Sequence, residues 1–219
     1  MTRLPRRAAI WIAVTGTFAA LNFYAANTVE RDGRQDAVYS YEVLVSAVLA
    51  YGLLLAFLFA LTSGLDRRET LALRAPHSWW RALGLAAASL AVIFAGVAVL
   101  LALTNAGDEQ NLTPEEWDGS RAGQYAASFL AIVLIGPVVE ELLYRGAGMS
   151  LLLPYGAPAA VLVTAVVFGF GHGLLLSLGA FVWFGLVVAG LRLWTTSVYP
   201  SILVHSAFNA VGMTVPLFV

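Results

Sequence analysis

The chain contains no cysteine, and it is poor in charged residues and in histidine. The absence of cysteine excludes disulfides, thiolate nucleophiles and metal sites with cysteine ligands. Only 11% of the 219 residues are charged and the formal net charge is -1, without a basic block that would indicate nucleic-acid binding. No internal repeat or low-complexity linker divides the chain, which favours one compact domain. Any chemistry must therefore come from a small number of ionisable side chains.

Apolar residues, by contrast, make up 60% of the chain, and its mean hydropathy is +0.81. Values this high are typical of a polytopic membrane protein rather than of a soluble domain. We expect an all-α fold, a transmembrane helical bundle with about seven membrane spans, although six or eight also fit the pattern. The expected spans cover about residues 8–26, 41–63, 82–104, 124–153, 159–173, 179–196 and 200–215.

The distribution of arginine predicts how these spans are oriented. Three arginines precede the first span and four lie in segment 64–81, whereas the loops at 27–40 and 105–123 are richer in acidic residues. Because arginine-rich segments stay on the cytoplasmic side, we expect an integral protein of the cell (plasma) membrane with its N-terminus in the cytoplasm. The start of the chain also resembles a signal peptide ending at Ala25-Ala26, but its apolar run is long enough to favour a retained first span.

The stretch from Pro137 to Gly146 places three charges, Glu140, Glu141 and Arg145, in a run that is otherwise apolar enough for a bilayer. A charge at the centre of a membrane helix costs at least about 2.5–3.5 kcal/mol, so such residues normally face the bundle interior and pair with one another. Glu141 and Arg145 are four residues apart, share one helix face and can form an ion pair. Glu140 points about 100° away from Glu141, without a cation beside it, and is therefore the candidate for chemistry.

Two of the three histidines lie in expected spans downstream of this stretch. His172 follows Phe168 by one helical turn, so the Phe168 ring can wall the imidazole. His205 and Asn209 are also one turn apart and can both donate hydrogen bonds to a single point. Taken singly, such residues are most often interhelical contacts. Together with Glu140, and with no other ionisable group expected deep in the bundle, they supply what hydrolysis of an acyl bond needs: a base for water and donors for an oxyanion.

Three motifs on successive membrane helices resemble those of the CPBP family: Glu140-Glu141-x-x-x-Arg145, Phe168-x-x-x-His172 and His205-x-x-x-Asn209. This family comprises the type II CAAX prenyl endopeptidases, the bacterial Abi proteins and bacteriocin-processing relatives. The resemblance covers about residues 124–215. It divides the chain into N-terminal spans and loops, residues 1–123, and CPBP/Abi-like catalytic helices, residues 124–219, within one compact membrane domain.

The resemblance implies an intramembrane endopeptidase that cuts a membrane-associated polypeptide, either prenylated or leader-containing, in contact with the lipid bilayer. It implies that Glu140 and His172 activate the attacking water, while His205 and Asn209 stabilise the oxyanion. The supporting residues that it implies are Glu141, Arg145 and Phe168. Helix geometry alone does not choose between the two glutamates, and the resemblance is what selects Glu140 as the base.

Metal dependence and the class of function each leave an alternative open. Glu140, His172 and His205 could supply a zinc site with an open position for water, but the sequence has no His-Glu-x-x-His helix. We favour a metal-free mechanism, because His205 is better explained as half of a donor pair with Asn209. A proton-coupled transporter also places Glu, His and Arg inside a bundle, but no inverted repeat is visible. A non-catalytic membrane scaffold is the remaining alternative.

Overall fold

The structure is a computed structural model that describes residues 3–28, 37–104 and 116–218. These residues are almost entirely helical, and no strand is found among them. The α-helices are α1 (Arg3–Thr28), α2 (Tyr41–Leu61), α3 (Arg67–Thr70), α4 (Trp79–Thr104), α5 (Ala122–Phe129), α6 (Gly136–Glu141), α7 (Met149–Leu152), α8 (Ala157–Gly171), α9 (Leu178–Thr195) and α10 (Tyr199–Thr214). Short 3₁₀ or π-helical segments join them: η1 (Ala37–Tyr39), η2 (Gly119–Arg121), η3 (Leu130–Ile135), η4 (Leu142–Gly148), η5 (Leu153–Tyr155) and η6 (Val215–Phe218).

Among the described residues, 6 helical stretches are long and apolar enough to cross a bilayer: Pro5–Thr28, Tyr41–Leu61, Trp79–Thr104, Gly119–Tyr155, Leu178–Thr195 and Tyr199–Phe218. The prediction of an all-α transmembrane bundle is therefore confirmed, and the chain is an integral membrane protein. The span expected at residues 159–173 is present as α8, which has only 15 residues. At 1.5 Å per residue α8 rises about 22 Å, less than the hydrocarbon core of about 30 Å.

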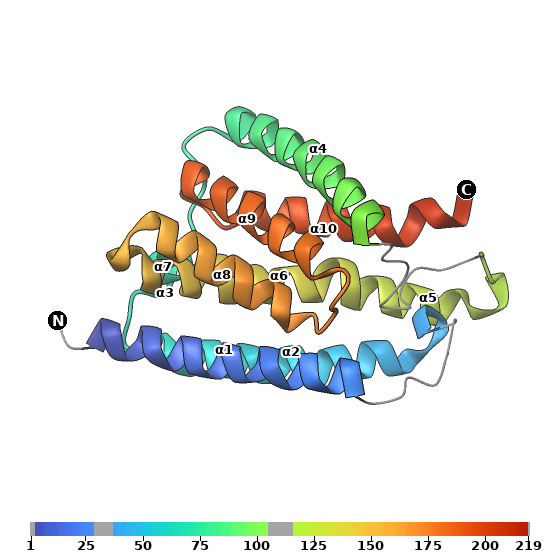
Figure 1. Ribbon diagram of the computed structural model, residues 1–219, viewed down its shortest axis with the longest axis horizontal. Coiled ribbons are helices and arrows are strands. Elements are labelled where there is room, and N and C mark those ends of the chain that lie inside the picture. The colour runs from blue at the N-terminus through green and yellow to red at the C-terminus, as the bar shows by residue number, and fades with distance from the viewer. Residues whose placement is uncertain (1–2, 29–36, 105–115, 219) are drawn as a thin grey trace.

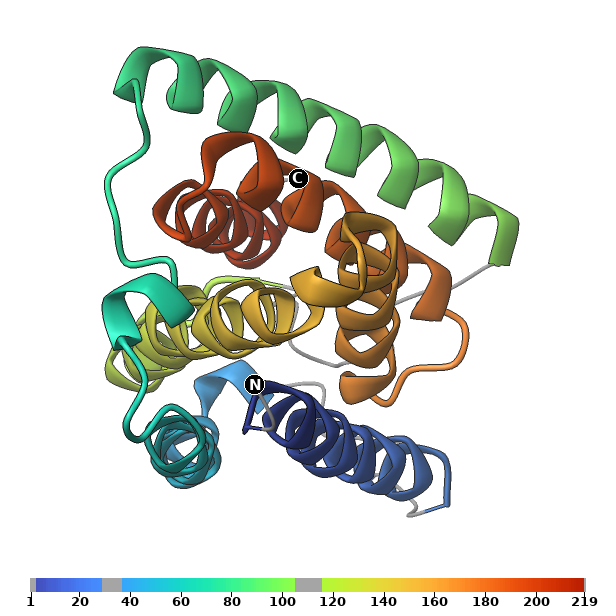
Figure 2. The same cartoon turned by 90° about the vertical axis from the view of Figure 1, so that its left-hand side faces the viewer.

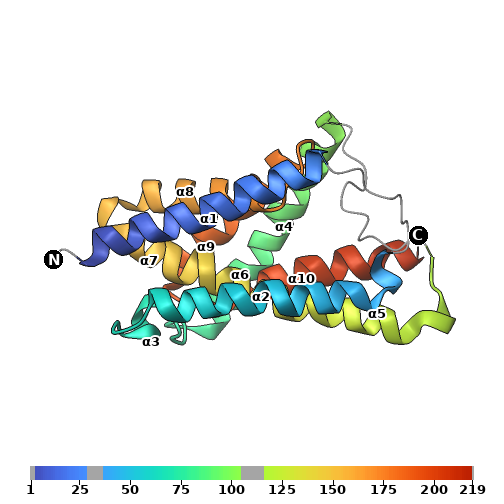
Figure 3. The same ribbon diagram turned by 90° about the horizontal axis from the view of Figure 1, so that it is seen from below.

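The helices form layers on either side of the long stretch Gly119–Tyr155. Figure 1 shows α1 and α2 on one side and α4 on the opposite side, with α6, α8, α9 and α10 between them, and Figure 2 shows the same order from the end of the bundle. In Figure 3, α3 and the N-terminus lie at one end, and α5 and the C-terminus lie at the other. We call these the α3 end and the α5 end.

α1 belongs to the core of the bundle. Trp11 is fully buried, and its Nε1 donates a hydrogen bond of 3.0 Å to the carbonyl oxygen of Leu143. Its ring lies so close to Gly148 that a Cβ built on this glycine would stand 2.5 Å from Trp11 Cζ2. α1 therefore packs as part of the bundle through this indole.

The stretch Gly119–Tyr155 is one long helix whose hydrogen bonding changes register. The π-helical segments η3 and η4 lie on either side of α6, which carries both glutamates. The N–H of Gly136 donates to the carbonyl oxygen of Ala131, five residues back. In that register the carbonyl oxygen of Ile132 would pair with the nitrogen of Pro137, which has no hydrogen. The π-helical turn before Pro137, which we call the wide turn, therefore leaves the Ile132 carbonyl available to a side chain.

α8 and α9 approach each other closely at Gly185. A Cβ built on Gly185 would stand 2.9 Å from Cα of Ala165, so the contact depends on the missing side chain. Phe168 of α8 and Phe184 of α9 stack with their ring centroids 5.6 Å apart. The guanidinium carbon of Arg145 lies 4.5 Å from the Phe168 centroid. The close contact thus brings aromatic rings of both helices against the charged stretch.

Candidate active site

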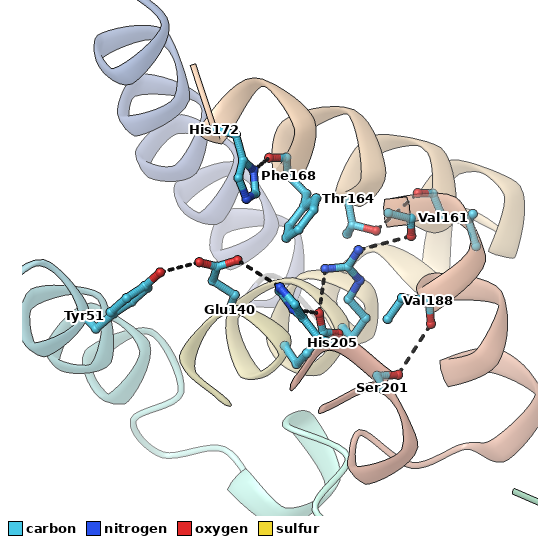
Figure 4. A network of polar contacts seen from close by, with 12 residues as sticks. Tyr51, Glu140, Val161, Thr164, Phe168, His172, Val188, Ser201 and His205 are labelled. Atoms are coloured by element: carbon cyan, nitrogen blue, oxygen red, sulfur yellow. Dashed lines mark hydrogen bonds and ion pairs between the residues drawn. The ribbon is translucent and has the colours of Figure 1, made fainter. Parts of the chain in front are cut away.

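One cavity of about 470 Å3 is lined by all four residues for which the sequence predicts catalytic roles. Glu140 reaches it from α6, His172 from the end of α8, and His205 and Asn209 from α10. Figure 4 shows the side chains of Glu140, His172 and His205. Because α8 is short, His172 at its end shares the cavity with residues from the middle of the other helices.

The two carboxylate oxygens of Glu140 have different surroundings. Oε1 accepts a hydrogen bond of 2.5 Å from the hydroxyl group of Tyr51 on α2 (Figure 4). Oε2 is buried, has no hydrogen-bond partner among the described residues, and lies 3.9 Å from Nε2 of His205. A buried acceptor without a partner is costly. Oε2 is therefore the oxygen of Glu140 that is not committed to a hydrogen bond with the described part of the chain.

Glu141 is engaged by other side chains and does not line the cavity. Its Oε1 accepts hydrogen bonds from Nη1 of Arg145 at 3.1 Å and from Nδ1 of His205 at 2.9 Å. The side chains of Glu141 and Arg145 have no exposed surface. Nη2 of Arg145 also donates to the carbonyl oxygen of Gly185 at 3.1 Å. The expected ion pair is thus present, wholly buried, and bound to both α9 and α10.

His172 has one ring nitrogen fixed by the backbone. Nδ1 lies 2.9 Å from the carbonyl oxygen of Phe168 (Figure 4). Since a carbonyl oxygen only accepts, Nδ1 carries the hydrogen of the neutral ring and Nε2 carries the lone pair. The ring centroid lies 4.6 Å from that of Phe168 and 4.0 Å from that of Phe181, on which it stacks. The expected packing of the Phe168 ring against the imidazole is present, and the Phe181 ring of α9 packs against it as well.

α1 holds the turn that carries His172. Asn22 and Asn27 donate from Nδ2 to the carbonyl oxygens of Gly171 and Gly173, each at 2.9 Å. Gly173 has a φ of +73°, and a Cβ built on it would stand 2.7 Å from the carbonyl oxygen of Asn22, so the turn requires glycine. Asn22 also lines the cavity. Asn22 places a polar amide in the first apolar run, which is a sequence signal for this contact, although Asn22 lies outside the three motifs.

His205 and Asn209 were expected to donate hydrogen bonds to one common point. Each of them instead uses one of its hydrogen-bonding groups on another part of the protein. Nδ1 of His205 donates to Glu141, which leaves Nε2 on the other side of the ring. Nδ2 of Asn209 donates at 2.9 Å to the carbonyl oxygen of Ile132, the one that the wide turn leaves available. Both residues line the cavity. The second amide hydrogen of Asn209, and Nε2 of a protonated His205, remain as donors for a ligand.

Two further neighbours of the site, besides Asn22 and Phe181, were not predicted from the sequence. Tyr51 lies outside the motifs, and a tyrosine in an apolar span has no distinctive sequence signal. Arg192 of α9 is only 3% exposed and donates from Nε to the carbonyl oxygen of Arg145 at 3.2 Å. The expectation that no other ionisable group lies deep in the bundle is therefore wrong. Arg192 stands in the last turn of α9, where the helix dipole favours a cation.

The zinc site that the sequence leaves open is not formed by this arrangement. Within the described residues, no three His, Cys, Asp or Glu side chains come together closely enough to hold one metal ion. Glu140 and His205 approach each other, with Oε2 and Nε2 3.9 Å apart, but His172 does not complete a set with them. The three residues line one cavity, but they do not form a three-ligand set for a metal ion there.

The comparisons with known proteins agree with the motifs. The family model described as type II CAAX prenyl endopeptidase Rce1-like matches residues 122–211. No curated protein and no solved structure matches the chain. The matched range contains all seven residues that the resemblance singled out, and it leaves out Asn22 and Tyr51. Residues 122–211 are thus similar to the type II CAAX prenyl endopeptidase Rce1-like family, in agreement with the three motifs.

Proposed function

We propose that this protein is an intramembrane endopeptidase in which Glu140 and His172 activate water to cut a peptide bond of a membrane-associated polypeptide. The observation that supports this most is the single cavity of about 470 Å3 that Glu140, His172, His205 and Asn209 line together. A base, an imidazole and two donors around one space are the groups that hydrolysis of an acyl bond requires.

Glu140 is better placed than Glu141 to act as the base. Glu140 lines the cavity, whereas Glu141 does not line it and binds Arg145 and His205 through its Oε1. The hydrogen bond from Tyr51 fixes the carboxylate of Glu140 by its other oxygen. These contacts support a positioning role for Glu141 and Arg145, and they support Glu140 as the reactive carboxylate.

These positions support the following reaction. A water molecule donates one hydrogen to Oε2 of Glu140 and the other to Nε2 of His172, which aims its oxygen at the substrate carbonyl. As that oxygen bonds to the carbonyl carbon, the water proton passes to Glu140 and the carbonyl oxygen becomes an oxyanion. The intermediate collapses when the C–N bond breaks and Glu140 returns its proton to the leaving amine. The products are one chain with a new carboxyl group and one with a new amino group.

His205 and Asn209 stabilise the oxyanion. When both ring nitrogens of His205 carry a hydrogen, Nδ1 donates to Glu141 and Nε2 is left to donate to a ligand. Asn209 is anchored by its bond to Ile132, so its second amide hydrogen has a fixed direction. Donors that are already held in place lose little freedom when charge develops on the substrate oxygen, which is why such a pair lowers the barrier.

The substrate is a membrane-associated polypeptide, prenylated or leader-containing, that reaches the cavity from the bilayer or its surface. The protein lies in the cell (plasma) membrane with its N-terminus in the cytoplasm, because arginine gathers at the α3 end. Residues 124–219 carry the catalytic helices. Residues 1–123 complete the same compact domain, since α1 and α2 supply part of the cavity wall.

Replacing Glu140 by glutamine tests this function. We expect Glu140→Gln to lower cleavage by roughly 10²–10⁴-fold, the usual contribution of a general base, without loss of the folded protein. The measurement is a proteomic comparison of membrane fractions from cells with the wild-type or variant protein, in search of new chain termini that only the wild type produces. Glu42→Gln, an exposed carboxylate on α2, is the matched control.

Other outcomes would point to the alternative functions. A change in proton-linked flux without a change in termini would indicate a transporter, and unchanged partner binding without any cleavage would indicate a scaffold.

Chelation tests the metal-free form of the mechanism. The donor set does not converge on one ion, so we expect a strong chelator to leave the cleavage rate of the purified protein unchanged. Metal analysis of the same sample should find no stoichiometric zinc. Zinc at one ion per chain, whose removal abolishes cleavage and whose return restores it, would overturn this mechanism.

A further inference from the structure

Arg192 is a buried cation that the proposed reaction does not use. It stands in the last turn of α9 and is only 3% exposed. Its Nε donates to the carbonyl oxygen of Arg145, which is a neutral acceptor, and within the described part of the chain it forms no ion pair. A charge removed from water is costly unless an opposite charge accompanies it, and the negative end of α9 supplies only about half an elementary charge. Arg192 therefore lacks a full counter-charge.

The part of Arg192 without partners is the tip of its guanidinium. Nη1 and Nη2 make no hydrogen bond to the described residues, since only Nε is bound. Neither atom is among the fully buried side-chain atoms that lack a partner in this part of the chain, so both keep some exposed surface. Two adjacent N–H donors on a planar cation match the oxygens of a phosphate or carboxylate group. The tip of Arg192 is thus suited to an anion that approaches the bundle surface.

Two other charged side chains act on Arg192 electrostatically, Arg74 and Glu69. Nη1 of Arg74 donates to both carboxylate oxygens of Glu69, each at 2.7 Å, and Nε of Arg74 donates to the carbonyl oxygen of Thr196. The charge of Glu69 is therefore offset by Arg74 before it can offset that of Arg192. Two positive charges stand against one negative charge in this group, which favours an anion as a further member.

The group lies at the depth where lipid head groups are expected. Trp194, in the same last turn of α9, is 72% exposed, and Trp79 and Trp80 at the start of α4 are 48% and 85% exposed. Exposed tryptophan is enriched where a membrane helix meets the head-group layer. An anion that reaches Arg192 is therefore carried by a lipid head group or dissolved in the adjoining solution.

We propose that Arg192, with Arg74 beside it, binds a phosphate-bearing anion at the α3 end. The buried guanidinium supplies free donors and an uncompensated charge, and the guanidinium of Arg74 adds to the positive field. An anionic phospholipid such as phosphatidylglycerol brings the phosphate to this depth, whereas inorganic phosphate brings the same chemistry from solution. Neither arginine lines the catalytic cavity, so the site does not depend on the proposed function.

Titration of the purified protein in a neutral detergent tests the site with three ligands: phosphatidylglycerol, phosphatidylcholine and inorganic phosphate. Native mass spectrometry reports the bound molecule, and thermal unfolding reports its effect. We expect phosphatidylglycerol to bind and to raise the unfolding temperature, and phosphatidylcholine to bind at least 10-fold more weakly because its choline neutralises the phosphate. An equal response to inorganic phosphate would support the site and identify the free anion as its ligand. Equal binding of the two phospholipids would overturn the inference.

Two substitutions of opposite effect separate this site from general attraction of anionic lipid to the α3 end. Arg192→Met removes the buried charge and should weaken phosphatidylglycerol binding by roughly 10-fold or more, as loss of a hydrogen bond between charged groups implies. Glu69→Gln removes the acidic member, releases Arg74 and should strengthen binding. Arg81→Gln removes an exposed charge of α4 and is the matched control, with unchanged binding. Equal affinities of the wild type, Arg192→Met and Glu69→Gln would overturn the inference.

Arg192→Met also leaves the carbonyl oxygen of Arg145 without its donor, so its unfolding temperature without lipid shows whether the variant is folded. If it is not, Glu69→Gln and Arg74→Gln decide, because their side chains are 69% and 36% exposed and lie outside the core. Arg74→Gln frees the carboxylate of Glu69 to neutralise Arg192 and should weaken phosphatidylglycerol binding. Unchanged binding in both of these variants would overturn the inference.

Discussion

At Tyr51, one hydroxyl group binds Oε1 of Glu140 and so orients its carboxylate. Tyr51→Phe keeps the ring and removes only the donor, so Oε1 loses its 2.5 Å hydrogen bond and the carboxylate can turn. A hydrogen bond to a charged group contributes about 1.5–3 kcal/mol, and we expect kcat to fall by roughly 10-fold or more. KM should change little, because the bond positions the base and not the substrate. Steady-state cleavage of a reporter polypeptide measures both constants.

The matched control is Tyr24→Phe, since Tyr24 is 68% exposed on α1 and lines no part of the cavity. It should retain the wild-type kcat. If Tyr51→Phe also kept the full kcat, or raised KM alone, the role of Tyr51 as a positioning residue would be wrong.

The residues of the site differ in how visible they are in the sequence. Glu140, His172 and His205 stand out because ionisable groups are rare and costly in apolar spans. Tyr51 does not, because aromatic side chains are ordinary in a membrane helix and its partner lies 89 positions away. The anchoring of Asn209 was likewise hidden, since it depends on a carbonyl that becomes available only through the wide turn before Pro137.

At the scale of helices, the contact between α8 and α9 depends on one glycine. Gly185→Ala would place a Cβ 2.9 Å from Cα of Ala165, where backbone and not a flexible side chain must give way. Overpacking of this kind typically costs about 1–3 kcal/mol, so the variant should unfold at a lower temperature in detergent and cleave more slowly. Gly190→Ala on the same helix is the control, because nothing lies within 4 Å of the point that its Cβ would occupy.

Gly190→Ala should be neutral or slightly stabilising, by about 0.5–1 kcal/mol, as expected for alanine in a helix interior. Equal thermal shifts for the two variants would show that helix propensity, and not the close approach of α8 and α9, governs this helix.

The helices themselves were largely predictable, because hydropathy marks apolar runs and Pro or Gly marks their ends. The span expected at 41–63 is α2, Tyr41–Leu61, and the one expected at 82–104 lies within α4, Trp79–Thr104. The two π-helical segments were not predictable in this way. They depend on which carbonyls find partners on α10 and elsewhere, and that is settled only by tertiary packing.

At the scale of the whole molecule, the two halves of the chain build one site. α1 contributes Trp11 and Asn22, α2 contributes Tyr51, and α4 packs on α9 and α10. We expect a chain cut at a protease site inserted between residues 105 and 115 to stay associated in detergent and to remain active. The fragment from residue 116 onward, purified alone, should lose at least the roughly 10-fold assigned to Tyr51.

Size-exclusion chromatography and the cleavage assay test these two expectations together. An isolated C-terminal fragment that folds and cleaves at the wild-type rate would show that the family-matched region is sufficient without α1 and α2.

The shortness of α8 has a consequence for the bilayer around the protein. Its 15 residues leave about 8 Å of a typical hydrocarbon core unspanned, although Leu162 and Phe170 expose its outer face. A helix shorter than the membrane is accommodated when the lipid layer thins beside it. Thinning beside the end of α8 would bring the aqueous phase close to His172 and the other residues proposed to be catalytic. Under the proposed function, the short helix would then help to supply the water that the reaction consumes.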